Sequence, residues 1–310
     1  MSEQSQDRVV ISDQPVVDFS HLTSPEQLAV IREIKDVALV IVPESLAAAY
    51  AAIPSSDIAS TIYVPDGVNV RTHTGALVVG GDGIGAEDDV LVVVGMLVIT
   101  SPVANPVPRR IYVIGSVLAP RGSEPLLGPA MAGGTGGVSY YQHADGQEVK
   151  LLSGQVKLSG AMLANPAGRP DDILIAAGQI VVSGEVNTVG YRSVIIAGQL
   201  VAPAASRDAI EPIAQIQGQA GWYEGGAPQV FNGDATLGAD FFRLLEHPVS
   251  LVVFGDLTIG AGVSEAVMRE KITGITVFGD AVAPPELMGM LQVLATDVFG
   301  DIRASDGPGS

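Results

Sequence analysis

The chain has 310 residues, enough for one large domain or two ordinary ones with a sizeable core. Its formal net charge is −18, with acids spread along its length, which argues against the basic face that a nucleic-acid partner requires. It has no cysteine, which excludes disulfides, thiolate zinc sites and cysteine nucleophiles. Only 16% of the residues are charged. Either assembly with other copies covers the remaining neutral surface, or strands are buried on both faces.

The N-terminal residues are polar and lack the basic-then-apolar order of a signal peptide. Residues 1–15 are expected to form a flexible lead-in. The longest apolar run, Val90 to Ile99, is interrupted by Gly95 and is too short to cross a bilayer as a helix. We therefore expect a cytoplasmic protein without a membrane span.

Residues 16–74 predict coils that each pair a strand with a helix. The segment from Thr23 has the hydroxyl cap, early proline and acid that begin a helix. Leu28, Ile31 and Ile34 would give that helix one apolar stripe.

Residues 75–237 lose the helical periodicity, and apolar runs recur around a glycine, which predicts a central β-solenoid. Four of these runs carry a glutamine after the glycine, at spacings of 24, 20 and 20 residues: Gln155, Gln179, Gln199 and Gln219. In coils stacked in register these side chains would lie roughly 4.8 Å apart and bond to one another. The 39 residues between Gly115 and Gly154 predict one further, degenerate coil near Val138.

Two loop excursions are expected within this region, at residues 128–146 and 219–230. The first contains Gly133 to Gly137, which lacks the lysine and the strand-to-helix context of a phosphate-binding loop and predicts a flexible loop. The two excursions contain four aromatic residues: Tyr140, Tyr141, Trp222 and Tyr223.

Residues 238–303 predict further strand–helix coils, because a Val-Phe-Gly-Asp motif occurs three times, with glycines 24 and 21 residues apart. The repeated side chains are Phe254, Phe278 and Phe299, and Asp256, Asp280 and Asp301. Stacked phenylalanines would form an internal row. Stacked aspartates would each need a backbone N–H, a cation or solvent, because like charges repel. Helices are expected at 240–245, 263–271 and 285–294, and residues 304–310 are expected to form a flexible tail.

We assign no catalytic residue, cofactor site or metal site. The acidic stretch from Gly80 to Asp89 approaches a calcium-binding nonapeptide, but Gly85 stands where a ligand should be, and one turn supplies too few oxygens. Asp171 and Asp172 with Arg169 form another dense charged spot, which is predicted to be a corner.

The central coils, short Val- and Ile-rich strands with glycine at a corner, resemble those of bactofilins, bacterial cytoskeletal β-solenoids that polymerise end to end without nucleotide. The resemblance covers about half of the chain, rests on pattern and implies a structural solenoid; no functional residue is carried over from it. The coils here run over about 20 to 24 residues, and the coils near both ends are similar to leucine-rich repeats without the Leu/Asn consensus.

These patterns predict a mainly β protein: one stack of about 12 coils, with a central β-solenoid and leucine-rich-repeat-like coils near both ends. The expected function is that of a non-enzymatic structural protein that assembles with itself into a filament, shell or scaffold. Two alternatives stay open. One is a carbohydrate-binding or carbohydrate-cleaving β-helix, which would stack sugars on the four aromatics under the two loops. The other is a monomeric scaffold for a different protein.

Overall fold

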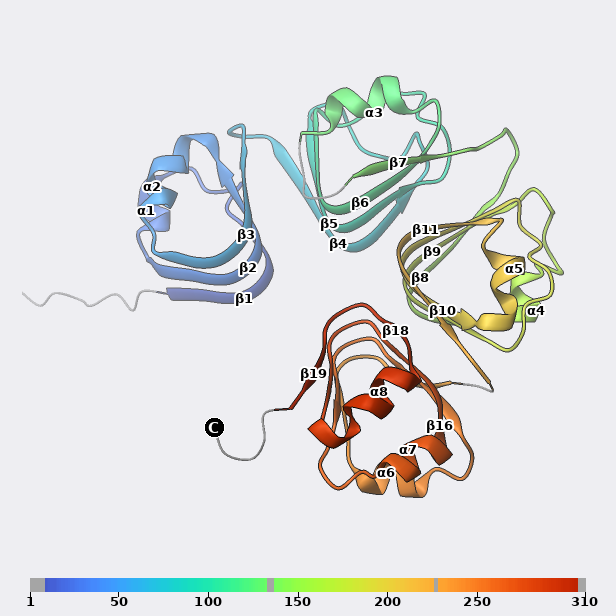
Figure 1. The fold of residues 1–310 in the computed structure, drawn as a ribbon. Helices are drawn as coiled ribbons and strands as arrows, with labels where there is room; N and C mark the ends of the chain where they lie inside the picture. Colours follow the sequence, from blue (N-terminus) through green and yellow to red (C-terminus); the bar gives the residue numbers. More distant parts are fainter. Residues whose placement is uncertain (1–8, 133–136, 226–227, 306–310) are drawn as a thin grey trace, which may run out of the picture. The chain divides into compact units, whose positions relative to one another are not determined.

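The computed structural model describes residues 9–132, 137–225 and 228–305. In these residues the protein is mainly β, and its strands form five sheets in which every pairing is parallel (Figure 1). The chain divides into two compact units, Met1–Asp145 and Gly146–Ser310. Such an architecture is compatible with a β-rich repeat fold.

The first unit contains two sheets. One has the order β1-β2-β3, and the other β4-β5-β6-β7, so each strand pairs with the next strand of the chain. The strands are β1 (Val9–Asp18), β2 (Ile31–Pro43), β3 (Ser55–Val64), β4 (Asn69–Val79), β5 (Asp89–Ile99), β6 (Arg110–Pro120) and β7 (Val138–Tyr141). Short helices fill the connections: α1 (Pro25–Leu28), η1 (Glu44–Leu46), α2 (Ala47–Ala51) and α3 (Glu124–Ala130).

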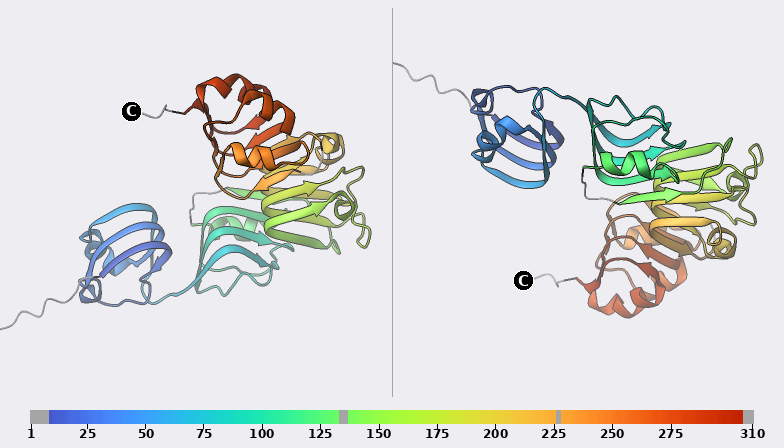
Figure 2. Two further views of the ribbon diagram at one scale, coloured as in Figure 1. Left: turned by 90° about the horizontal axis from the view of Figure 1, so that it is seen from below. Right: turned by 90° about the horizontal axis from the view of Figure 1, so that it is seen from above.

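The second unit begins with the sheet β11-β10-β9-β8. Its elements are β8 (Val149–Ser159), α4 (Gly160–Leu163), β9 (Ile173–Ser183), β10 (Ser193–Pro203), η2 (Ala204–Ser206), α5 (Arg207–Ile210) and β11 (Ala214–Tyr223). Figure 2 shows these strands stacked one above another, as in the other sheets.

The last part of this unit has two sheets that alternate along the chain, β12-β14-β16-β18 and β13-β15-β17-β19. Their strands are β12 (Gln229–Phe231), β13 (Ala235–Leu237), β14 (Val249–Val253), β15 (Leu257–Ile259), β16 (Ile272–Val277), β17 (Ala281–Ala283), β18 (Ala295–Val298) and β19 (Ile302–Ala304). The helices are α6 (Ala239–Leu244), α7 (Glu265–Lys271), η3 (Pro285–Leu287) and α8 (Met288–Leu294). They confirm the three helices predicted for these coils.

Inside each group of coils, strand and helix side chains form a separate apolar core. In the sheet β8–β11, for example, Leu174 and Leu200 pack with Leu163 of α4 and Ile210 of α5. In the last coils, Leu257 packs with Met268 of α7 and its neighbours. Because successive strand residues point to opposite faces, the outer face of a sheet is a different set of residues.

The outer faces are apolar as well, and pairs of sheets pack through them. In the first unit, Leu39 and Ile41 of β2 cluster with Val90 and Val92 of β5. In the second unit, the outer faces of β9, β10 and β11 cluster with that of β14 and with the corner phenylalanines. The members are Val181, Val201, Tyr223, Val252, Phe254 and Phe278. Strands buried on both faces explain the low charge of the chain.

The prediction of one continuous stack is wrong. Among the described residues no strand pairing joins β3 to β4, β7 to β8, or β11 to β12. The edge strands carry polar side chains where inner strands such as β5 and β9 are apolar. Examples are Ser55 of β3, Thr72 of β4, Lys157 of β8 and Gln215 of β11. All four of these side chains are exposed, so solvent satisfies their polar groups.

Two predictions near the N-terminus are also corrected. Residues 9–15, expected in the lead-in, belong to β1, in which Asp13 interrupts the apolar alternation that reveals a strand. The first helix ends at Leu28, because Ile31 and Ile34 lie in β2 and pair with Val9 and Ile11. Their spacing of three fits a helix, but β-branched residues with parallel partners form the strand instead.

The degenerate coil predicted near Val138 is confirmed, because Val138 of β7 pairs with Val117 of β6. In the second expected excursion, residues 219–223 continue β11. Residues 133–136 of the glycine-rich loop lie outside the described residues, as do residues 1–8 of the lead-in and 306–310 of the tail. Ala304, placed in the tail by prediction, is the last residue of β19.

Candidate functional site

Four glutamines form a row across the sheet β8–β11, which we call the glutamine row: Gln155, Gln179, Gln199 and Gln219. Each is directly opposite the next in the parallel pairing. Nε2 of Gln179 donates to Oε1 of Gln199, and Nε2 of Gln199 donates to Oε1 of Gln219, both at 3.3 Å. Gln155 is exposed and the other three are half-buried. Oε1 of Gln179 is buried and has no hydrogen-bond partner in the structure.

A glycine precedes every member of the glutamine row, and backbone geometry requires it. Gly198 has a φ of +136°, a conformation that side chains disfavour. A Cβ atom on Gly198 would lie only 2.2 Å from the carbonyl oxygen of Gly178 on the neighbouring strand. The strands therefore approach at this corner only because no side chain intervenes.

The repeated aspartates lie at the corners between the last two sheets, and with Asp234 they form what we call the aspartate row: Asp234, Asp256, Asp280 and Asp301. Oδ1 of each of the first three accepts the backbone N–H of the aspartate in the next coil, at distances of 2.8–3.0 Å. Arg303 also donates to Oδ2 of Asp280, at 2.6 Å. Backbone donors thus lie between the like charges, and Arg303 adds a cation at Asp280.

The phenylalanine row, Phe254, Phe278 and Phe299, lies beside the aspartate row. Successive rings are stacked, with centroids 4.9 Å apart and interplanar angles of 17° and 12°. Phe254 and Phe278 are buried, whereas Phe299 in the last coil is 39% exposed. The row is therefore part of the packing, and only its last ring faces solvent.

The four aromatics of the expected sugar site are divided between the two units. Tyr140 and Tyr141 belong to the first unit, and Trp222 and Tyr223 to the second. The last three of these are at most 5% exposed. The Tyr141 hydroxyl donates to the carbonyl of Ile99 at 2.6 Å, and burial raises the pKa of that hydroxyl.

The second buried tyrosine is held in the same way. The Tyr223 hydroxyl donates to the carbonyl of Val182 at 3.0 Å, and burial raises its pKa too. Arg207 lies 5.1 Å from the ring centroid of Trp222, a cation–π contact. Trp222 packs in the core of its own sheet and Tyr223 in the cluster between two sheets, so neither ring offers a flat face to a sugar.

The corner with Asp171 and Asp172 is a polar cluster. Asp172 is 1% exposed, and its carboxylate lies 3.2 Å from Nζ of Lys150 and 3.4 Å from Nε of Arg169. The backbone N–H of Arg169 makes the largest contribution to lowering the pKa of Asp172 to about 2, with Lys150 and Asn165 assisting and burial opposing. Asp171 is exposed. Oδ2 of Asp172 is held by Lys150, Asn165 and the backbone N–H of Arg169, whereas Oδ1 is buried without a hydrogen bond and has only the nearby Arg169 side chain.

The acidic stretch before β5 is simpler. Asp89 accepts a hydrogen bond from Asn69, which lowers its pKa, and lies 3.8 Å from Arg71. Asp82 and Asp88 are exposed. Within the described residues no group of three or more histidine, cysteine, aspartate or glutamate side chains could hold a metal ion.

A groove of about 290 Å³ lies between the first strands of two sheets in the second unit. Gln155 and Lys157 of β8 line one side, and Val230 of β12 with Asn232 lines the other. The groove is thus bordered by the first member of the glutamine row and by the start of the last coils. Prediction from the sequence missed it, because residues over 70 positions apart form its walls.

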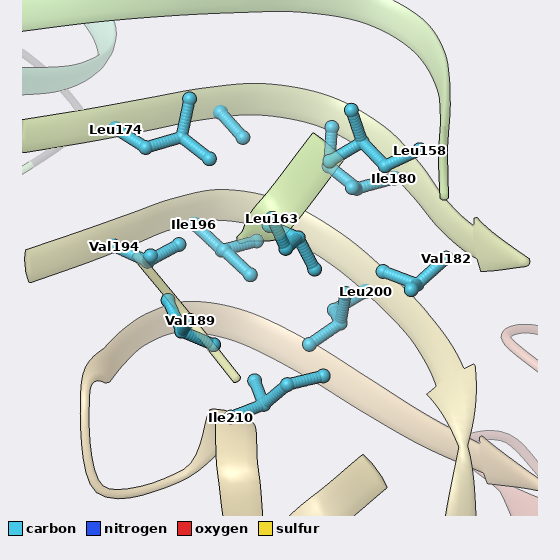
Figure 3. A pocket seen from close by; sticks show the side chains of 11 residues that line it. Leu158, Leu163, Leu174, Ile180, Val182, Val189, Val194, Ile196, Leu200 and Ile210 are labelled. Carbon is cyan, nitrogen blue, oxygen red and sulfur yellow. The ribbon is translucent and has the colours of Figure 1, made fainter. Parts of the chain in front are cut away.

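A second cavity, shown in Figure 3, lies inside the sheet β8–β11 and holds only about 10 Å³. Aliphatic side chains such as Leu174, Ile196 and Leu200 point into it from several strands. A void of this size without polar groups stays dry, so it is part of the core.

Sequence analysis also missed a row of three aspartates in the first sheet. Asp13, Asp36 and Asp57 occupy equivalent positions in β1, β2 and β3, and all three have positive φ angles, of 58°, 53° and 54°. Aspartate tolerates this conformation better than most residues. The signal was available, since one aspartate recurs at intervals of 23 and 21 residues.

Comparison with known proteins finds no matching family model, no matching curated protein and no matching solved structure. Among the described residues, no helix is long and apolar enough to cross a membrane.

Proposed function

We propose that this chain is a non-enzymatic structural protein, built from short β-solenoid stacks, that assembles with copies of itself. The observation that carries the proposal is the parallel, residue-for-residue pairing of equivalent strands, which leaves an unpaired strand at each end of every stack. Such a strand presents free N–H and C=O groups to which another chain can add.

The polar side chains support a structural role. Glutamines bond to glutamines and aspartates to the backbone of the next coil, so these groups hold the stacks together. The carbohydrate alternative has less support, because Tyr141, Trp222 and Tyr223 are buried. A sugar would have to use the groove between β8 and β12, where amides are present but no exposed ring is.

Electron microscopy of the purified protein over a concentration series, together with sedimentation velocity, tests the proposal. Regular filaments, sheets or closed shells, or oligomers that grow with concentration, are expected. A monomer at every concentration would overturn the proposal and favour the scaffold for a different protein.

A further inference from the structure

The two stacks of the second unit run side by side in the same direction. Their first strands, β8 and β12, border the same groove. Their last strands, β11 and β18, are in contact, and the backbone N–H of Trp222 donates to Asp297 at 2.9 Å. One end of the unit thus presents the first strands β8, β12 and β13, and the other presents the last strands β11, β18 and β19.

The aspartate row has a direction, and it is open at both of these ends. Every bond in it runs from a backbone N–H to the carboxylate of the preceding coil. Among the described residues, the N–H of Asp234 has no partner in the first coil, and the carboxylate of Asp301 has none in the last. The free donor at one end is complementary to the free acceptor at the other.

The glutamine row has the same direction. Gln179 and Gln199 each donate to the glutamine of the following strand, whereas Oε1 of Gln179 accepts no hydrogen bond from Gln155. Among the described residues, Nε2 of Gln219 has no acceptor at the last strand, and Gln155 is exposed at the first. The row would continue if a second β8 followed β11 at the spacing of adjacent strands.

The last coil also exposes an aromatic ring whose equivalents in the inner coils are buried. Phe299 is 39% exposed, whereas Phe254 and Phe278 of the same row are 7% and 8% exposed. A further coil stacked on this end would cover the Phe299 ring as Phe299 covers Phe278.

We propose that a second copy of this chain docks head to tail on this end, with its β8, β12 and β13 continuing the sheets that end at β11, β18 and β19. The proposal rests on the proposed self-assembly and specifies its surface. Asp301 of one copy then accepts the N–H of Asp234 of the next. A two-fold contact between two last coils is disfavoured, because it brings two Asp301 carboxylates together without a donor. Head-to-tail contacts leave both outer ends open and so produce a filament.

Two variants block one end each. Asp301→Lys removes the acceptor from the last coil, where its carboxylate has no partner among the described residues. Asn232→Pro blocks the first coil. Phe231 turns its carbonyl towards Phe254, so the neighbouring residue 232 turns its N–H to the open edge, which proline removes. Asp88→Lys makes the same charge change at an exposed site in the first unit and serves as the control.

Sedimentation velocity is measured on each variant and on an equimolar mixture of the two. Each variant alone is expected to lose association by at least about tenfold, and the control to keep it. The mixture is expected to form a one-to-one dimer that does not grow, because each partner supplies one intact end. Recovery of dimer in the mixture also shows that both variants are folded.

The outcomes separate this inference from the proposed function. If the wild type associates and both variants associate equally well, the head-to-tail surface is wrong, but the proposed self-assembly is not contradicted. If Asn232→Pro alone still associates and the mixture adds nothing, the contact is two-fold and the inference fails. A wild type that stays monomeric overturns both.

Discussion

The glutamine row and the aspartate row lie in the same unit and both stack one polar side chain per coil, but they satisfy it differently. An amide carries both a donor and an acceptor, so Gln179 and Gln199 bond directly to each other. A carboxylate only accepts, so Asp256 instead takes the backbone N–H of Asp280. Like charges can therefore stack at this spacing when the backbone supplies a donor between them.

The backbone geometry of these corners requires the glycine that precedes each glutamine, but it does not require the glutamine. The sheet β4–β7 has glycines at equivalent positions, Gly75, Gly95 and Gly115, again with positive φ angles. The residues after them are not amides: Ala76, Met96 and Ser116. The glycine corner is thus common to both sheets, and the glutamines are an addition in β8–β11.

The largest loss in the free energy of unfolding is expected from Gly198→Ala, because the new Cβ would overlap the Gly178 carbonyl and the φ angle is unfavourable for alanine. Strain and steric overlap each cost about 1–3 kcal/mol, so unfolding in urea should show a loss of about 3 kcal/mol or more. Gly154→Ala is the matched control. It also has a positive φ but open space around the Cβ position, and should lose only about 1–2 kcal/mol. Equal losses would contradict the close approach of the strands.

Gln179→Glu replaces one amide of the glutamine row by a carboxylate. As in the aspartate row, this group only accepts hydrogen bonds, but here no donor is placed beside it. It loses the bond to Oε1 of Gln199 and places a half-buried charge beside that oxygen. We expect a loss of about 2 kcal/mol in the free energy of unfolding at pH 7. Gln155→Glu, at the exposed start of the row, should change stability by less than about 0.5 kcal/mol. Comparable stability of the two variants would mean that the row is not held together by its amides.

Asp256→Ala should have a smaller effect, about 1 kcal/mol, because it leaves the backbone N–H of Asp280 unpaired at a corner where water can reach it. Asp256→Asn keeps the accepting Oδ1 and should restore most of the stability. Asp301→Ala removes a carboxylate that accepts no bond from the described part of the chain, and thermal unfolding should detect almost no change. If Asp301→Ala destabilised the protein as much as Asp256→Ala, the hydrogen bonds from backbone N–H to carboxylate would not be what stabilises the row.

Much of this arrangement could be predicted from local spacing. Glutamines at intervals of 20 to 24 residues place equivalent side chains on neighbouring strands, and Val138 lies where the glycine spacing requires one more coil. The helices of the last coils follow from capping and periodicity, as at Ser264, whose side chain accepts the N–H of Val267.

The division into separate sheets could not be predicted in the same way, because a coil at the end of a stack has nearly the same local pattern as one inside it. The difference lies in a few polar positions, such as Thr72 of β4 and Lys157 of β8, and these also fit a solvent-exposed face. Residues 230–234 are recognisable from the sequence as a slipped copy of the motif, but Asp234 is not predicted in the row because its coil is offset: Phe231 pairs with Val253 and not with Phe254. The corner of Asp171 and Asp172 could be predicted, but the groove and the contact of Lys150 with Asp172 join distant segments, for which one sequence carries no signal.

The Asp172 carboxylate is stabilised in a third way, by cations and a backbone N–H at one corner. Its contribution to stability depends on pH only in the acidic range. Its pKa is lowered from 3.8 to about 2 in the folded protein, so folding favours the ionised form. This contribution is fully present above pH 4 and is lost as the pH falls through 2. The difference in unfolding free energy between wild type and Asp172→Asn should therefore be constant above pH 4 and should narrow below it. Asp171→Asn, at the exposed neighbour, should follow the wild-type profile throughout. A difference that stays constant down to pH 2 would show that the carboxylate is not held in its ionised form by Lys150 and Arg169.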